Sequence, residues 1–277
     1  MKILVKKADG KKELFDEKKL KGSLRASGAE KKVIDEIIYD IVEVCYDGIT
    51  SDIIYKMAFR LLKNKSKSAS IRYNLTNAIY LLGPEGFAFE VFLAEIAKTM
   101  GYKKVQTGKK IRGRCMEHEM DVVGERDGEM LSLESKFHNS RSKKSDLQVI
   151  LYMKARFQDI ENSSYYKGKK SRQVIVTNTK FTDNAKRYAK CSGTEVVSWD
   201  YPKKNLHDYI LESNVHPVTA LVSLPKAARK DFIDKGIITI KHLAENNYKK
   251  LEDCKFLSHI NIKKIKEEIQ EFFPDKI

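Results

Sequence analysis

The sequence predicts a multidomain protein of mixed α+β and α/β class. We expect an N-terminal β-hairpin with helices, a central mixed sheet flanked by helices, and a small helical C-terminal domain. The 277 residues are enough for two or three domains. The central part alternates strand-like and helix-like segments, whereas both flanks show mainly helical periodicity. These shifts divide the chain into residues 1–83, 84–213 and 214–277.

The composition favours a basic cytoplasmic protein that binds a polyanion. The formal net charge is +15, and the excess of lysine and arginine is spread along all three segments, which suits DNA binding. No apolar run approaches the roughly 18 to 20 residues of a membrane span, and the N-terminal apolar stretch is too short for a signal peptide. The four cysteines lack CxxC spacing, so we expect buried free thiols without zinc or disulfides.

The N-terminal segment begins with a predicted hairpin, in which the turn ADGK joins ILVKK to KELF. Helical patterns follow in VIDEIIYDIVEVCY and SDIIYKMAFRLLK. Asp16 and Ser51 are plausible helix starts, because short polar side chains cap helix N-termini. The central segment then opens with the helix GFAFEVFLAEIAKTMGY, which Gly101 ends.

The second half of the central segment predicts a helix over residues 146–161 and a buried strand over 172–178. The segment FTDNAKRYAKCSG predicts a helix with Thr182 near its cap, and TEVVSWD predicts another strand. This strand–helix–strand order indicates a mixed sheet covered by helices.

Residues 117–138, EHEMDVVGERDGEMLSLESKFH, predict a hairpin around the strong two-residue turn signal Asp127-Gly128. With that turn, Asp121 faces Glu134 and Glu119 faces Lys136. Side chains alternate along strands, so these four lie on one face. The opposite, core face contains Met120, Val122, Leu131 and Leu133.

The charged face predicts a metal site. Directly opposed carboxylates lie about 5 Å apart and repel each other, and a folded domain retains such a pair when a cation lies between them. Asp121, Glu134 and Glu90 on the preceding helix would bind Mg²⁺ or Mn²⁺, because hard cations prefer carboxylate oxygens and keep waters that act as nucleophiles. Lys136 would stabilise charge that builds on phosphorus. The alternative is an exposed hairpin face held by salt bridges.

Further polar residues accompany this set. Gln148, on the following helix, is either a site residue or an ordinary surface residue. His138 lies on the Lys136 face and is a candidate contact for phosphate or a metal-bound water. We expect His118 to be a packed or boundary residue on the Met120 face, and Glu119 to be a partner of Lys136 or a supporting carboxylate.

These residues resemble the PD-(D/E)xK nuclease superfamily and, within it, the restriction-endonuclease-like domains of the type IV, Mrr-like class. The matching positions are Glu90 in FEVFLAEIAKTMGY, Asp121 in HEMDVVG, and Glu134 and Lys136 in LSLESKFHN. The later VIVTNTKFTDNAKRYAKCSG resembles the strand and helix that follow the core motif. The resemblance covers residues 84–212 and implies metal-dependent hydrolysis of DNA.

The N-terminal segment resembles the ATP-cone, the nucleotide-sensing module of ribonucleotide reductases and of their transcriptional repressor. The match lies in VKKADGKKELFDEKKL, YDGITSDI and RYNLTNAIYLLGP, and spans nearly all of residues 1–83. It implies that ATP or dATP binds as an effector, and no Walker A motif is present that would hydrolyse it. Ala8 replaces the arginine that usually follows the first lysine. The implied nucleotide contacts are Val5, Lys7, Glu13, Phe15, Lys19 and Thr50.

The tail, residues 214–277, resembles helix-hairpin-helix-like modules, and Gly236-Ile237 and Lys263-Lys264 are its first candidate DNA contacts. Dimerisation or packing is the alternative role.

Together these patterns predict a cytoplasmic, nucleotide-regulated, Mg²⁺-dependent DNA endonuclease of the restriction or genome-defence kind, in which the nucleotide changes activity or the homo-oligomeric state. The alternative function is a nucleotide-responsive DNA-binding regulator whose nuclease fold is catalytically inert.

Overall fold

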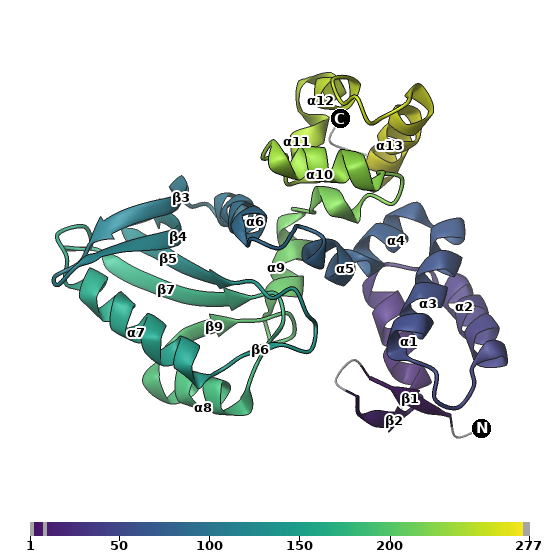
Figure 1. The fold of residues 1–277 in the computed structure, drawn as a ribbon, viewed down its shortest axis with the longest axis horizontal. Helices are drawn as coiled ribbons and strands as arrows, with labels where there is room; N and C mark the ends of the chain where they lie inside the picture. Colours follow the sequence, from purple (N-terminus) through teal and green to yellow (C-terminus); the bar gives the residue numbers. More distant parts are fainter. Residues whose placement is uncertain (1–2, 8–9, 274–277) are drawn as a thin grey trace. The chain divides into compact units, whose positions relative to one another are not determined.

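The computed structural model describes residues 3–7 and 10–273, and the chain forms two compact units (Figure 1). One unit combines the N-terminal residues through Ala78 with Val218–Asp231 and the residues from Leu243 onward. The other unit comprises Ile79–Pro217 and Phe232–His242. None of the helices in the described residues combines the length and apolar character that crossing a bilayer requires.

The first unit begins with two short antiparallel strands, in which Leu4 lies opposite Leu14. The predicted turn between them includes residues 8 and 9, which lie outside the described residues. Five helices follow, and the predicted start at Asp16 is confirmed because its carboxylate accepts the Lys19 N–H. The second predicted start, Ser51, is the first helical residue, and Thr50 is the cap. The elements are β1 (Leu4–Lys6), β2 (Lys12–Leu14), α1 (Glu17–Ala26), α2 (Lys31–Val44), α3 (Ser51–Lys65), α4 (Lys67–Tyr73) and α5 (Leu75–Tyr80).

The C-terminal segment is helical, as predicted. Its elements are η1 (Val218–Ala220), α10 (Lys226–Asp234), α11 (Ile240–Ala244), η2 (Glu245–Tyr248), α12 (Lys249–Glu252) and α13 (His259–Phe272). Within the first unit, the guanidinium of Arg72 on α4 lies 4.9 Å from the ring centre of Phe272 on α13. The buried carboxylate of Glu268 accepts the backbone N–H groups of Val222 and Ser223 at 2.6 and 2.9 Å. These contacts connect α13 to the N-terminal helix α4 and to the C-terminal residues Val222 and Ser223 of the same unit.

The second unit is built around a mixed five-stranded sheet in the order β3-β4-β5-β7-β9. The first three strands are antiparallel, whereas β5, β7 and β9 run parallel. The strands are β3 (Lys103–Arg112), β4 (Glu117–Arg126), β5 (Glu129–Lys136), β7 (Lys170–Thr177) and β9 (Glu195–Val197); β6 (Lys144–Ser145) and β8 (Lys180–Phe181) form a separate pair. The helices are α6 (Phe87–Thr99), α7 (Leu147–Glu161), α8 (Asp183–Ser192) and α9 (Leu206–Ser213).

Helices cover both faces of this sheet, with α7 and α8 on one side and α6 and α9 on the other (Figure 1). The α7 side contains a cluster that includes Ile150, Phe157 and Ile175. Residues Met130 through Ser135 of β5 are all buried, as expected for a strand whose two faces are both covered. The prediction of a hairpin with one core face and one polar face is therefore wrong in this part of the chain.

Most predicted elements of this unit are confirmed, including α7, β7, β9, and α8 with Thr182 as its cap. The edge strand β3, which contains four lysines and one arginine, was not predicted. All four cysteines are free thiols, but Cys254 alone is buried while Cys115 and Cys191 are exposed. The expectation of buried thiols is therefore wrong for both exposed residues.

Candidate active site

The turn predicted at Asp127-Gly128 is confirmed, because both residues have positive φ angles of 49° and 77°, as a type I′ turn requires. The ladder between β4 and β5 then has the predicted register, from Arg126 opposite Glu129 to Val122 opposite Leu133. Beyond this pair the two strands separate. The turn therefore sets the register without bringing the charged residues into one ladder.

The prediction that Asp121 faces Glu134 and Glu119 faces Lys136 is wrong. The β4–β5 ladder ends at the pair Val122–Leu133. Beyond it β4 keeps its pairing with β3, where Glu119 lies opposite Lys110, and β5 keeps its pairing with β7. Side chains replace the missing ladder bonds: the Asp121 carboxylate accepts the Ser135 N–H at 2.6 Å, and Arg156 donates to the Glu119 carbonyl. These side-chain bonds satisfy backbone groups where the strands diverge.

The alternation of side chains also changes at Asp121. Met120 and Val123 both pack in the cluster on the α7 side, although residues three apart point to opposite faces in a regular strand. The register of β3 puts Gly108 opposite Asp121, and Gly108 has a φ of 61°. Local irregularities of this kind bend a strand and often occur beside active sites. Asp121 therefore lies at a bend and does not belong to a continuous charged face.

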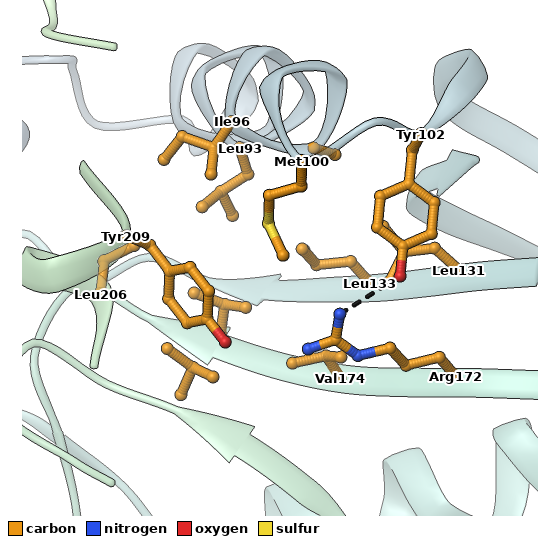
Figure 2. Close-up of a pocket in the computed structure, with 13 residues that line it drawn as sticks. Leu93, Ile96, Met100, Tyr102, Leu131, Leu133, Arg172, Val174, Leu206 and Tyr209 are labelled. Carbon is orange, nitrogen blue, oxygen red and sulfur yellow. Dashed lines mark hydrogen bonds between the residues drawn. The ribbon is translucent and has the colours of Figure 1, made fainter. Parts of the chain in front are cut away.

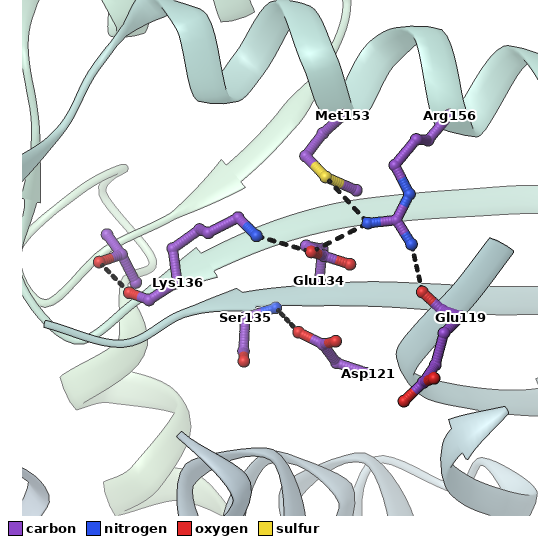
Figure 3. A network of polar contacts seen from close by, with 8 residues as sticks. Glu119, Asp121, Glu134, Ser135, Lys136, Met153 and Arg156 are labelled. Atoms are coloured by element: carbon purple, nitrogen blue, oxygen red, sulfur yellow. Dashed lines mark hydrogen bonds and ion pairs between the residues drawn. The ribbon is translucent and has the colours of Figure 1, made fainter. Parts of the chain in front are cut away.

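Glu134 is the centre of the polar network in Figure 3. Its side chain is buried, and one oxygen, Oε1, accepts both Lys136 Nζ at 2.7 Å and Arg156 Nη1 at 3.2 Å. Its other oxygen, Oε2, is buried without a hydrogen-bond partner. A buried carboxylate is tolerated when cations compensate its desolvation, and here two cations share a single oxygen while the other oxygen stays available.

Three carboxylates influence one another at this end of the sheet. Burial, together with the negative charges of Asp121 and Glu134, raises the pKa of Glu90 to about 7. Burial and the charge of Asp121 also raise the pKa of Glu134, while Lys136 and Arg156 oppose that shift. Like charges that disfavour each other's ionisation are typical of sites that accept a cation or a proton.

The donor set has the chemistry of a hard-cation site. Asp121, Glu134 and Glu90 offer carboxylate oxygens, and the unpartnered Oε2 of buried Glu134 is a polar atom that lacks a ligand. Among the described residues, however, no three His, Cys, Asp or Glu side chains are grouped closely enough to hold an ion together. Mg²⁺ retains several waters and needs only one or two carboxylates, so Asp121 and Glu134 fit this ion and Glu90 is a third candidate.

The other predicted residues, Gln148, His118 and His138, differ in burial and in hydrogen-bond partners. Gln148 is exposed in the first turn of α7 and is not among the hydrogen-bond partners found for Glu134 and Lys136. His118 is buried, as expected, with Nε2 2.8 Å from Asp159 Oδ2. His138 Nε2 lies 2.9 Å from Ser145 Oγ, and burial and nearby lysines lower its pKa.

Sequence reasoning missed Arg156 and Asp159, two residues of α7 that contact β4 or the β3–β4 loop. Both flank the buried stripe of Met153, Phe157 and Ile160. Arg156 lies three positions after Met153, and Asp159 lies directly before Ile160, so both side chains are close enough to the stripe to reach the sheet. That spacing was the available signal, but it does not reveal which acceptor each side chain meets.

A separate apolar cavity lies between α6, the sheet and α9 (Figure 2). Leu93, Leu131 and Leu206 are among its lining residues. The only charged lining residue among those described is Arg172, which donates to Glu195 at 2.6 and 3.0 Å and to Tyr102 at 3.2 Å. Because this one cation is already paired with Glu195, the cavity has no free charged group to bind or activate a substrate.

The first unit contains a cavity of about 200 Å³ that is lined by five of the predicted nucleotide contacts: Val5, Lys7, Glu13, Phe15 and Lys19. Glu13 Oε2 lies 3.3 Å from Lys7 Nζ and 3.9 Å from Lys19 Nζ. Tyr55 and Tyr73 add a stacked aromatic pair with centroids 5.1 Å apart. Thr50 does not line this cavity; its hydroxyl accepts the Ile53 N–H at 3.2 Å. The matching residue Asp9 lies outside the described residues.

Comparison with known proteins agrees with this architecture. Residues 82–203 match the family model described as restriction endonuclease, and residues 216–273 match the model described as AF1548-like, C-terminal. An uncharacterized protein of Archaeoglobus fulgidus is 32% identical over 180 residues, which are 65% of this chain and 97% of that protein.

Two solved structures are also similar. The crystal structure of AF1548, a protein of unknown function, has a TM-score of 0.54 and 28% identity and covers 68% of this chain and 99% of its own. A repair endonuclease from Pyrococcus abyssi has 25% identity over 38% of this chain and 42% of its own, with a TM-score of 0.29 that is too low to support an argument. The chain therefore belongs to the same family as the Archaeoglobus protein, with a restriction endonuclease-like domain over residues 82–203 and an AF1548-like C-terminal domain over residues 216–273.

Proposed function

We propose that this protein is a Mg²⁺-dependent endodeoxyribonuclease of the restriction or genome-defence kind, regulated by an adenine nucleotide. The observation that carries the proposal is the convergence of Asp121 and Glu134, with Lys136 bound to Glu134, at the point where β4 and β5 separate. This convergence lies within the restriction endonuclease domain. The net charge of +15 supports DNA as the substrate.

Each residue of the site would have a different role in phosphodiester hydrolysis. Asp121 and Glu134 would hold Mg²⁺, with Glu90 as a further ligand. When bound, the ion supplies an activated water and charge stabilisation at the phosphate. Lys136 presents an ammonium group beside the buried Glu134 carboxylate, where it stabilises negative charge that builds on the phosphate oxygens. Arg156 fixes the same carboxylate from α7 and restrains the adjacent Glu119 backbone.

The cavity of the first unit supports the regulatory part of the proposal. Its two lysines offer charge to phosphates, and its apolar and aromatic residues offer surface to a base. Glu13 lies within ion-pair distance of both lysines. We therefore assign ATP or dATP to this cavity as an effector. A nucleotide acts on cleavage or on self-association only by binding two states of the protein with different affinity.

One experiment tests the enzymatic part and separates it from the alternative. Supercoiled plasmid is incubated with the full chain in Mg²⁺ or in EDTA, each with and without ATP. Nicked or linear product in Mg²⁺ alone supports the nuclease. DNA binding without cleavage under every condition, with Mn²⁺ also tried, would favour the DNA-binding regulator. That alternative is motivated by the two cations that already occupy Glu134 Oε1.

A further inference from the structure

The loop between β3 and β4 has a fixed backbone and exposed side chains. It spans residues 113–116, and Arg114, Cys115 and Met116 in it are exposed, as is Arg112 at the end of β3. Met116 is 58% exposed. The side chains at the tip of this loop therefore contribute little to the core.

The backbone of the loop is held by Asp159 of α7. One carboxylate oxygen of Asp159 accepts the Cys115 N–H at 2.7 Å, and the other accepts the Met116 N–H at 3.2 Å and lies 2.8 Å from His118 Nε2. The Asp159 carbonyl accepts the Arg114 N–H at 3.1 Å, and within the loop Gly113 donates to the Met116 carbonyl at 2.7 Å.

We call the Asp159 carboxylate and its bonds to the loop the brace. Gly113 shows how closely the loop packs against it. A Cβ atom at this position would lie 2.2 Å from Asp159 Oδ2, so no other residue is accommodated without moving the carboxylate. A loop whose backbone is fixed by one half-buried carboxylate, Asp159, while its own side chains face solvent, is arranged to present those side chains. Fixing them in advance lowers the entropy cost of binding a partner.

The composition of the tip identifies the partner. Two arginines, Arg112 and Arg114, precede the exposed Met116, and this combination suits DNA, because arginine binds phosphates and apolar side chains enter grooves or base steps. Glu117 lies opposite Arg112 in the β3–β4 ladder. Its negative charge would oppose the approach of phosphates.

The tip is also connected to the candidate active site. From Met116, β4 runs directly to Glu119 and Asp121. On α7, Asp159 holds the tip and Arg156, three residues earlier and therefore on the same side of the helix, holds Glu134 and the Glu119 carbonyl. One helix thus positions both the loop and the catalytic carboxylate.

We propose that this braced tip is a DNA-docking element, in which Arg112 and Arg114 contact phosphates and Met116 packs into a groove of the duplex. The proposal rests on the nuclease function proposed above and names a surface through which that site would receive its substrate. The brace would fix the distance between the docked DNA and the carboxylates.

Binding is measured by fluorescence anisotropy with a labelled duplex in EDTA, across a series of salt concentrations, using the full chain. The Arg112→Gln/Arg114→Gln variant should reduce the slope of log affinity against log salt by about 2, since each phosphate contact contributes about 0.9. The Arg187→Gln/Lys190→Gln variant removes the same charge from the exposed surface of α8 and should change the slope less.

Two single variants separate specific contact from overall charge. Met116→Ala should weaken binding about fivefold without changing the salt slope, because it removes apolar surface and no charge. Glu117→Gln should strengthen binding, since it removes a repulsive charge. Each altered side chain is exposed, and matching thermal melts would establish that the variants are folded.

The outcomes distinguish this proposal from the proposed function. If the parent cleaves DNA but the tip variants match the α8 control in affinity and slope, the docking element is wrong and the nuclease stands. If the parent does not bind DNA at low salt, both proposals fail. If Met116→Ala binds as the parent does while the arginine variant is weakened, the groove contact is wrong and only a phosphate contact remains.

Discussion

Arg156 donates from Nη1 to Oε1 of Glu134 over 3.2 Å, from a helix to the buried carboxylate on the neighbouring strand. The same oxygen accepts Lys136, so Glu134 Oε2 is left as the oxygen free to meet a ligand. Arg156 therefore both compensates the desolvation of Glu134 and determines which of its oxygens is available.

The first prediction concerns this positioning role. Arg156→Met should lower the rate of DNA cleavage by about 10- to 100-fold, the range for residues that orient a ligand. Because Arg156 opposes the raised pKa of Glu134, the variant should also move the acidic limb of the pH–rate profile to higher pH. Single-turnover cleavage between pH 5 and 9 measures both effects.

The surface variant Arg187→Met is the matched control for loss of an arginine. A purely structural role for Arg156 would lower the melting temperature without displacing the pH profile. An unchanged profile in a folded Arg156→Met protein would therefore remove Arg156 from the site.

The second prediction tests the proposed catalytic residues. Asp121→Asn and Lys136→Ala should each reduce Mg²⁺-dependent cleavage by at least about a hundredfold, while DNA affinity in EDTA stays within about twofold. Asparagine retains an oxygen for the Ser135 N–H bond, so the loss would reflect charge and not local unfolding. Plasmid nicking and anisotropy are the measurements, and undiminished cleavage by either variant would contradict the assignment.

Local rules predicted much of the catalytic unit. The Asp127-Gly128 turn set the register of β4 and β5, and the capping residue Thr182 located the start of α8. These signals depend on a few neighbouring residues. The point where β4 and β5 separate depends instead on Asp121 and Arg156, whose side chains bind backbone groups of β5 and β4, and on Gly108 of β3 with its positive φ.

The edge strand β3 is a second element that local sequence rules could not predict. Its sequence, KKVQTGKKIR, is rich in lysine and contains a glycine, both of which are depleted in strands. Lysines are nonetheless common on edge strands, where they oppose pairing with other chains. Only the position of β3 at the edge of the sheet explains its composition, and that position is a property of the fold.

The third prediction follows from the raised pKa of Glu90, about 7 against an ordinary 4.5. The folded protein holds this proton more tightly than the unfolded chain, so the contribution of Glu90 to stability is greatest below pH 4.5 and is lost as the pH rises to about 7. In EDTA at pH 8, Glu90→Gln should therefore melt about 2–4 °C above the parent. At pH 5 the difference should shrink.

Scanning calorimetry measures these temperatures, with the exposed Glu85→Gln as control. If Glu90 is also a metal ligand, Mg²⁺ should stabilise the parent at pH 8 more than it stabilises Glu90→Gln. Equal pH dependence of the parent and Glu90→Gln would show that Glu90 does not titrate in this range.

The last prediction concerns the cavity of the first unit. ATP or dATP should bind there with about micromolar affinity, remain unhydrolysed, and change the cleavage rate or the oligomeric state. Lys7→Ala/Lys19→Ala should abolish binding, because these lysines supply the charge that faces the phosphates. Glu13 contacts both lysines, so Glu13→Gln should release them and strengthen binding.

Calorimetric titration of the full chain measures these affinities, with Lys31→Ala/Lys32→Ala on the exposed start of α2 as the charge-matched control. Loss of binding in the first double variant alone, with Mg²⁺-dependent cleavage intact in the absence of nucleotide, would separate the sensor from the catalytic site. If neither nucleotide gives heat with the parent, or if both double variants bind alike, the cavity is not a nucleotide site. In that case Glu13, Lys7 and Lys19 form an ordinary surface ion-pair cluster, whose contribution to stability is small.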